Sequence, residues 1–162
     1  MLAAVRGGVL CIVAVAVLLL AGCGGSGGSP RLSASAYRAK LTQIKQEAAT
    51  AQANVAKGLQ AKSLAELQQK LDAFASDTQR IGDEVAKLNP PQDAEAANTE
   101  LAAGLHETAR ATKVASTKIA GLHTPTEAIA YLESSPANAK GARQVDEALT
   151  KLKKLGYASS TS

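Results

Sequence analysis

The sequence predicts an all-α fold, an up-down helical bundle of about four helices that follows an apolar N-terminal segment and a flexible tether. Apolar residues recur every three or four positions through residues 35–157, which is the spacing of helices that bury one side. No window in this region shows the period-two alternation of a strand. Proline and glycine divide the pattern, and short connections between long helices favour antiparallel packing.

Residues 1–22 have the three parts of a secretory signal. Arg6 precedes an apolar run from Val9 to Leu20, and the small residues Ala21 and Gly22 follow it. A run of roughly 12 residues is about 18 Å long as a helix, which is too short for the ~30 Å hydrocarbon core of a bilayer. A short apolar run that ends in small residues is typical of a cleaved signal rather than of a spanning helix.

The segment Leu20-Ala21-Gly22-Cys23 resembles the lipobox of bacterial lipoproteins, and all four positions match directly behind the apolar run. The resemblance implies that the Cys23 thiol receives a diacylglyceryl group and that a peptidase cleaves between Gly22 and Cys23. Two or more acyl chains anchor a protein stably. We therefore expect the chain to be held at the extracytoplasmic face of the cell membrane through lipid on Cys23. An ordinary signal in which Cys23 is incidental is the alternative.

Residues 23–34 are expected to form the lipidated cysteine and a tether. The stretch Gly24–Pro30 (GGSGGSP) has the composition of a flexible linker with a span of about 15 Å. Removing residues 1–22 from the 162 leaves 140, the size of one domain with a core of its own. Cys11 would leave with the signal, so a single cysteine remains and no intrachain disulfide can form.

Charge and aromatic content limit the partners of this domain. Loss of Arg6 leaves 17 of the 18 basic residues against 14 acidic ones, a net charge of +3. This mild charge is interspersed along the chain, which permits weak attraction to anionic lipid or wall polymers. Three Tyr, one Phe and no Trp provide no stacking set, so no nucleic acid partner is expected.

The first two helices are expected at about Ser35–Lys62 and from Ser63 to Leu88. The inward stripe of the first is Tyr37, Leu41, Ile44, Ala48, Ala51 and Val55. Ser63 and Glu66 fit a capping box, and Asn89-Pro90-Pro91 must end the second helix. Its stripe is Leu64, Leu67, Leu71, Phe74, Thr78, Ile81, Val85 and Leu88. Because these positions form nearly perfect heptads, a parallel coiled-coil oligomer is the alternative to packing within one chain.

The third helix is expected at about Gln92–Leu122. Its stripe combines small and apolar side chains: Ala94, Ala97, Leu101, Leu105, Thr108, Thr112, Ala115, Ile119 and Leu122. The corner Leu88-Asn89-Pro90-Pro91, with Leu101 and Gly104-Leu105 downstream, is similar to the hairpin corner of small helical lipoproteins of high-GC Gram-positive bacteria. Those families are largely of unknown function, so the resemblance implies a bundle and no activity.

The fourth segment opens at Thr124, with Pro125 at the first helical position and Glu127 completing a capping box. We expect a short helix to about Glu133, a break at Ser134-Ser135-Pro136, and a last helix from Pro136 to Leu155. The residues expected to face inward are Ala142, Val145, Leu149, Leu152 and Leu155. Gly156 is the expected C-cap, and residues 158–162 form a polar tail.

The chemistry-bearing residues do not form a recognisable catalytic or metal motif. His106 and His123 are 17 residues apart, which on one helix separates them by about 100° and ~25 Å, so they cannot share a metal. They are interpreted as two solvated helix histidines. No serine lies in a Gly-x-Ser-x-Gly turn, and the side chains of adjacent acids such as Asp83-Glu84 diverge on a helix. We expect no catalytic residue, no metal and no cofactor.

These observations predict a membrane-anchored lipoprotein whose non-catalytic helical bundle is an interaction module of the cell envelope, with a possible envelope protein partner. The alternative is a carrier of a small apolar ligand in the bundle interior. For that alternative, the small residues Ala94, Ala97 and Ala115 would leave a cavity. The hydroxyls of Thr78, Thr108 and Thr112 either line it or bond back to a helix carbonyl.

Overall fold

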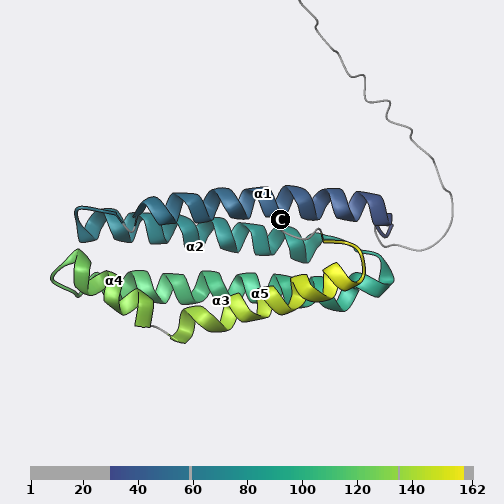
Figure 1. Cartoon of the computed structure of the whole chain (residues 1–162). Coiled ribbons are helices and arrows are strands. Elements are labelled where there is room, and N and C mark those ends of the chain that lie inside the picture. The colour runs from purple at the N-terminus through teal and green to yellow at the C-terminus, as the bar shows by residue number, and fades with distance from the viewer. Residues whose placement is uncertain (1–29, 59, 135, 159–162) are drawn as a thin grey trace, which may run out of the picture.

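The computed structural model describes residues 30–58, 60–134 and 136–158, and all regular structure within them is helical. Five α-helices are present: α1 Ala34–Gly58, α2 Leu64–Lys87, α3 Glu95–Ile119, α4 Pro125–Ser134 and α5 Pro136–Lys154, with the short 3-10 helix η1 Gln92–Ala94 before α3 (Figure 1). The all-α prediction is confirmed. The expected number of about four is corrected to five, because the break at Ser134–Pro136 divides the fourth segment into α4 and α5.

The long helices α1, α2 and α3 lie side by side, and α4 and α5 follow one another along α3 (Figure 1). The most extensive helix contacts join α2 to α3 and α3 to α5, whereas α1 packs mainly on α2. The last layer therefore rests on α3 rather than along α1. No helix within the described residues has the length and apolar character needed to cross a membrane.

Capping residues place the helix starts where the sequence predicts them. The Ser63 hydroxyl accepts a hydrogen bond from the backbone N–H of Glu66 at 3.2 Å, and the Glu66 carboxylate accepts from the N–H of Lys62. The hydroxyl of Thr124 and the carboxylate of Glu127 form the same pair of bonds at the start of α4. Each pair satisfies N–H groups that a helix start leaves without a partner.

The first helix ends at Gly58, earlier than the expected Lys62. A Cβ on Gly58 would lie 2.6 Å from the Cβ of Lys70, so α1 meets α2 closely at this point. Backbone bonds from Gln60 to Lys57 and from Ala61 to Gly58 then turn the chain toward α2. Gln60 and Ala61, which the sequence pattern assigns to the first helix, are therefore part of this turn.

The central position of α3 explains why its apolar stripe is wider than the sequence pattern indicates. The predicted positions from Ala94 to Ile119 are buried, except that Thr108 is half-buried. Six further residues are also buried, because α2 and α5 cover different sides of the helix: Asn98, Ala102, Gly104, Ala109, Ala111 and Ser116.

The buried face of α5 differs from the predicted one. Leu149 is 39% exposed and Leu155 is 42% exposed, and Ala142 is also exposed. The buried residues are Gly141, Ala148 and Leu152, with Val145 half-buried. A Cβ on Gly141 would lie 2.6 Å from the backbone nitrogen of Thr108, and one on Gly104 would lie 2.9 Å from that of Val145. The missing side chains of the two glycines allow α5 to approach α3, so small size rather than hydrophobicity selects the inward face.

The predicted C-cap at the end of α5 is confirmed. Gly156 has a φ of 79°, and its N–H donates to the carbonyl of Lys153. The N–H of Tyr157 donates to the carbonyl of Leu152 at 2.8 Å. This pair of bonds is a Schellman motif, in which glycine provides the left-handed residue.

The core is divided into two clusters. The larger core cluster draws on α1, α2, α3 and α5 and consists of Tyr37, Leu41, Ile44, Ile81, Val85, Ala94, Ala97, Leu101, Ala102, Leu105, Ala148 and Leu152. The smaller core cluster lies toward α4 and consists of Leu67, Leu71, Ile119 and Ala128, with half-buried apolar side chains around it.

Candidate functional site

The predicted lipidation and cleavage residues, Cys23 and Gly22, lie outside the described residues. The described chain begins at the corner between α2 and α3. There the N–H of Leu32 donates to the carbonyl of Asn89 at 2.7 Å, and the guanidinium of Arg31 donates to the carbonyl of Pro90 at 3.1 Å. Arg31 also pairs with Glu95 at 2.8 Å. These bonds hold Arg31 and Leu32 at this end of the helical domain.

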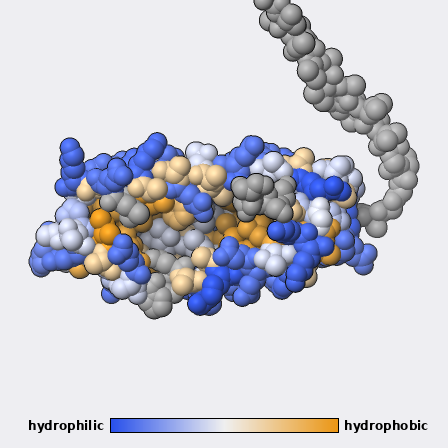
Figure 2. Space-filling view, viewed as in Figure 1, coloured by the Kyte–Doolittle hydropathy of each residue, from blue (hydrophilic) through white to orange (hydrophobic). Residues whose placement is uncertain are grey.

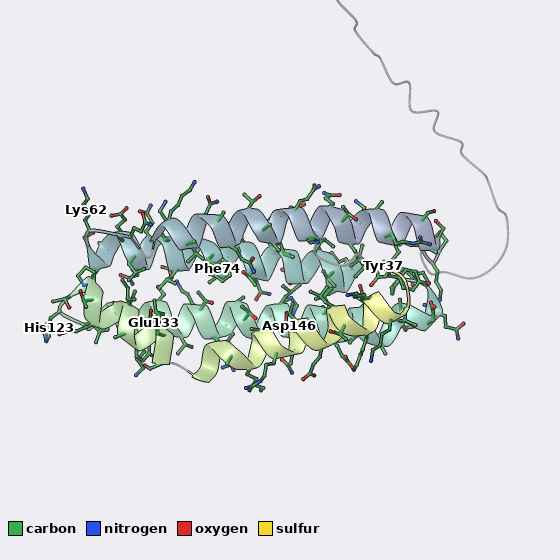
Figure 3. All side chains as sticks on the ribbon, in the orientation of Figure 1. Tyr37, Lys62, Phe74, His123, Glu133 and Asp146 are labelled. Carbon is green, nitrogen blue, oxygen red and sulfur yellow. The ribbon has the colours of Figure 1, made fainter. Side chains whose placement is uncertain are left out.

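A cavity of about 140 Å³ that is open to solvent on one side lies between the two core clusters. It is lined by side chains from four helices: Ala48, Ala51 and Gln52 from α1, Phe74, Thr78 and Ile81 from α2, Leu105 and Thr108 from α3, and Ala142, Val145 and Asp146 from α5. Figure 2 shows hydrophobic side chains on both sides of a hollow in the middle of this face of the molecule. In Figure 3, Phe74 is labelled at α2 and Asp146 at α5, two of the helices that line the cavity.

Small side chains and a gap between helices create this cavity. The inward positions of α1 change from Leu41 and Ile44 to Ala48 and Ala51, which reach less far toward the other helices. No large side chain of α5 replaces the missing volume, because α5 packs on α3. Phe74, the only phenylalanine, is half-buried at the cavity wall.

The expected cavity residues are partly correct. Thr78 and Thr108 line the cavity, whereas Thr112 does not, and its hydroxyl donates to the carbonyl of Thr108 at 2.9 Å. The alanines expected to line it are buried elsewhere: Ala94 in η1, and Ala97 and Ala115 in α3. The prediction of buried alanines is therefore confirmed, but they do not line the cavity.

The polar groups of the cavity differ in how they are satisfied. The hydroxyl of Thr108 donates to the carbonyl of Gly104 at 2.9 Å. Thr78 is 5% exposed, and its hydroxyl has no hydrogen-bond partner among the described residues. Gln52 and Asp146 are exposed to solvent and so mark the mouth of the cavity. The only polar group inside the cavity that is both buried and unpartnered is therefore the Thr78 hydroxyl, within the part of the chain described.

The two histidines occupy different environments. The Nε2 atom of His106 lies 3.0 Å from the carboxylate of Asp83, and the ring is partly buried against Gly82, where a Cβ would come within 2.4 Å of it. His123 is exposed in the turn after α3 (Figure 3). The interpretation as two solvated helix histidines is therefore corrected: His106 is paired with Asp83, and His123 lies beyond the helix end. No group of three or more potential metal ligands exists among the described residues.

A serine and an aspartate come together in a way that could suggest nucleophilic catalysis. The Ser116 hydroxyl donates to the Asp72 carboxylate at 2.6 Å, and Lys113 donates to the same oxygen at 3.0 Å. These hydrogen bonds, with that of Ser116 the stronger cause, lower the pKa of Asp72. Ser116 is 1% exposed, so no substrate can reach its oxygen. The arrangement joins α2 to α3 and does not form a catalytic site.

A buried polar network, which the sequence analysis did not identify, lies in the larger core cluster. The Tyr37 hydroxyl donates to the Asn98 side-chain oxygen at 3.0 Å, and the Asn98 amide donates to the carbonyl of Val85 at 3.0 Å. Burial, with a smaller contribution from Tyr157, raises the pKa of Tyr37 to about 12. The signal in the sequence was the position of Asn98, four residues after Ala94 and three before Leu101, which places a polar side chain on the inward stripe.

Comparisons of the chain with protein-family models, with curated proteins and with solved structures return no significant match.

Proposed function

We propose that the chain is the precursor of a lipid-anchored, non-catalytic lipoprotein whose domain is an up-down helical bundle that contacts other components of the cell envelope. The observation that carries this proposal is the segment Leu20-Ala21-Gly22-Cys23 directly behind the apolar run that ends at Leu20. Lipid on Cys23 would hold the protein at the extracytoplasmic face of the membrane, with no spanning helix required.

The bonds of Arg31 and Leu32 indicate which end of the helical domain would lie nearer to the membrane. Arg31 and Leu32 are bonded to the corner between α2 and α3, so the tether leaves from the end that contains the larger core cluster. The opposite end, with the turns at 58–63 and 119–125, would then project away from the membrane and be available to an envelope partner.

The anchor is tested by expressing the full chain and its Cys23→Ala variant in a lipoprotein-competent bacterium. We expect the wild type to enter the detergent phase with a lipid adduct in its intact mass, and the variant to show neither. Secretion of the wild type without lipid would overturn the anchor. Cross-linking from single-residue probes at Lys62 and at Lys87 then tests the orientation, since a partner at the projecting end reacts only with the first.

A second function, carriage of a small apolar ligand, is favoured by the cavity between the two core clusters. Ligand sites in bundles lie between helices and are lined mainly by apolar side chains. Native mass spectrometry of protein purified without added ligand tests this function: a bound small molecule released by organic solvent supports carriage. A protein of bare mass that also fails to bind any small apolar probe contradicts it.

A further inference from the structure

The volume of the cavity limits the ligand to a small molecule. A cavity of about 150 Å³ lined by apolar side chains holds one benzene molecule, and the present cavity has about 140 Å³. A fatty acyl chain, a sterol or a peptide of several residues does not fit into this volume. The ligand is therefore of roughly the size of a single six-membered ring.

The lining excludes an ion from the cavity interior. Ile81, Leu105 and Val145 provide apolar walls, and the one charged lining residue, Asp146, is exposed at the mouth. An ion among these apolar walls would lose its hydration, and the one lining carboxylate, that of Asp146, lies at the exposed mouth rather than inside. An anion would in addition be repelled by the Asp146 carboxylate at the entrance. The ligand is therefore neutral.

Thr78 gives the cavity one point of polar recognition. Its hydroxyl is the buried lining group without a hydrogen-bond partner in the described chain, whereas the hydroxyl of Thr108 already donates to Gly104. A hydroxyl can donate and accept, so a ligand with one hydroxyl or carbonyl group would satisfy it. A purely apolar ligand would leave it unsatisfied, at a cost that the polar ligand avoids.

The mouth of the cavity lies between α1 and α5. Gln52 of α1 and Ala142 and Asp146 of α5 are exposed there, and α5 rests on α3 instead of packing along α1. A small ligand can therefore enter without separating α2 from α3 or α3 from α5, the two pairs with the most extensive contacts.

We propose that this cavity is a binding site for a small neutral molecule with an apolar ring-sized body and a single hydrogen-bonding group, which the Thr78 hydroxyl recognises. The inference rests on the second proposed function and specifies its ligand class and its specificity-determining residue.

Benzene and phenol are the probes, because they share a ring and differ in one hydroxyl. The lipidated full-length protein in nanodiscs is titrated with each, and binding is followed through the methyl signals of Ile81 and Val145, which line the cavity and are kept in every variant, with Leu67 as a distant reference. We expect phenol to bind at least as tightly as benzene. The isosteric variant Thr78→Val is expected to weaken phenol binding about tenfold or more and to leave benzene binding within about twofold of the wild type.

Two variants provide the controls. Thr108→Val removes a lining hydroxyl whose hydrogen is already donated to Gly104, so the ratio of phenol to benzene affinity should change much less than in Thr78→Val. Ala51→Leu fills the cavity and should abolish the binding of both probes while the helical circular dichroism is retained. If both probes bind and Thr78→Val does not change the ratio of phenol to benzene affinity, the inference is overturned. The proposed carriage of a small ligand is then still supported. If neither benzene nor phenol changes the methyl signals of the cavity, both the inference and the proposed carrier function are overturned.

Discussion

The two core clusters of this molecule differ in how many helices build them and in how their polar groups are satisfied. The larger core cluster combines four long helices and contains the hydrogen-bonded pair Tyr37 and Asn98. The smaller one depends on the ten-residue helix α4, in which Ala128 is the only buried residue. The comparison teaches that the two ends of one helical domain can be built by different sets of helices, and the cavity is lined only by α1, α2, α3 and α5.

The largest expected effect compares the same substitution in the two clusters. Leu152 and Leu67 are both fully buried. Leu152→Ala should lower the free energy of unfolding by about 4 kcal/mol, because the surrounding helices cannot collapse into the space. Leu67→Ala should cost about 2–3 kcal/mol, since the half-buried side chains around it can relax. Urea unfolding followed by circular dichroism measures both, and an equal or larger cost at Leu67 would contradict the ranking.

High pH should weaken the larger core cluster selectively. The pKa of Tyr37 is raised from 10.0 to about 12 because burial disfavours the phenolate. A raised folded-state pKa contributes stability that is complete below pH 10 and is lost as the pH rises toward 12. At 1.36 kcal/mol per unit, the loss amounts to roughly 2–3 kcal/mol.

The tyrosine effect is isolated by comparing Tyr37→Phe with the wild type. At pH 8 the variant should be less stable by about 1–2 kcal/mol, because the Asn98 oxygen loses its donor. Between pH 10 and 12 the wild type should lose its advantage, so that the two unfolding midpoints converge. Tyr131→Phe, at the smaller core cluster, is the control and should run parallel to the wild type. Midpoints that stay equally separated through pH 12 would argue against a buried, un-ionised Tyr37.

The parts of the fold that the sequence predicts are those fixed by local chemistry. Ser63, Thr124 and Gly156 determine helix ends through bonds within a few residues, and the sequence contains all the partners. The buried face of α5 was predicted only in part. Leu152 is buried as expected, whereas Leu149 is exposed, because the face also depends on close contact with Gly104 of a different helix. The cavity depends on the distance between α1 and α5, which no periodicity encodes. The unpartnered state of Thr78 is likewise a tertiary property, although its place on an inward stripe was predictable.

A third comparison separates a glycine required by packing from one that is not. Gly141→Ala should destabilise the protein by about 2 kcal/mol, because the new Cβ would meet the Thr108 backbone and push α5 away from α3. Gly121→Ala should change the stability by less than about 0.5 kcal/mol, since the nearest atom is 3.6 Å from the new Cβ. Thermal unfolding of both variants measures the difference. A neutral Gly141→Ala would mean that α3 and α5 are not in close contact.

The smallest expected effect concerns the start of α4 and should be local. The Thr124 hydroxyl accepts from the N–H of Glu127, so Thr124→Ala removes about 1 kcal/mol of capping. Because α4 buries one residue, we expect this loss to appear as faster hydrogen exchange in α4, by about fivefold, with little change in global unfolding. Ser33→Ala removes the matching bond to Ala36 at the start of α1, where Tyr37 and Leu41 tie the helix to the larger core cluster. Its cost should therefore appear in global unfolding. If both variants shift the global transition equally, the two ends unfold as one unit and the contrast between the clusters does not extend to their dynamics.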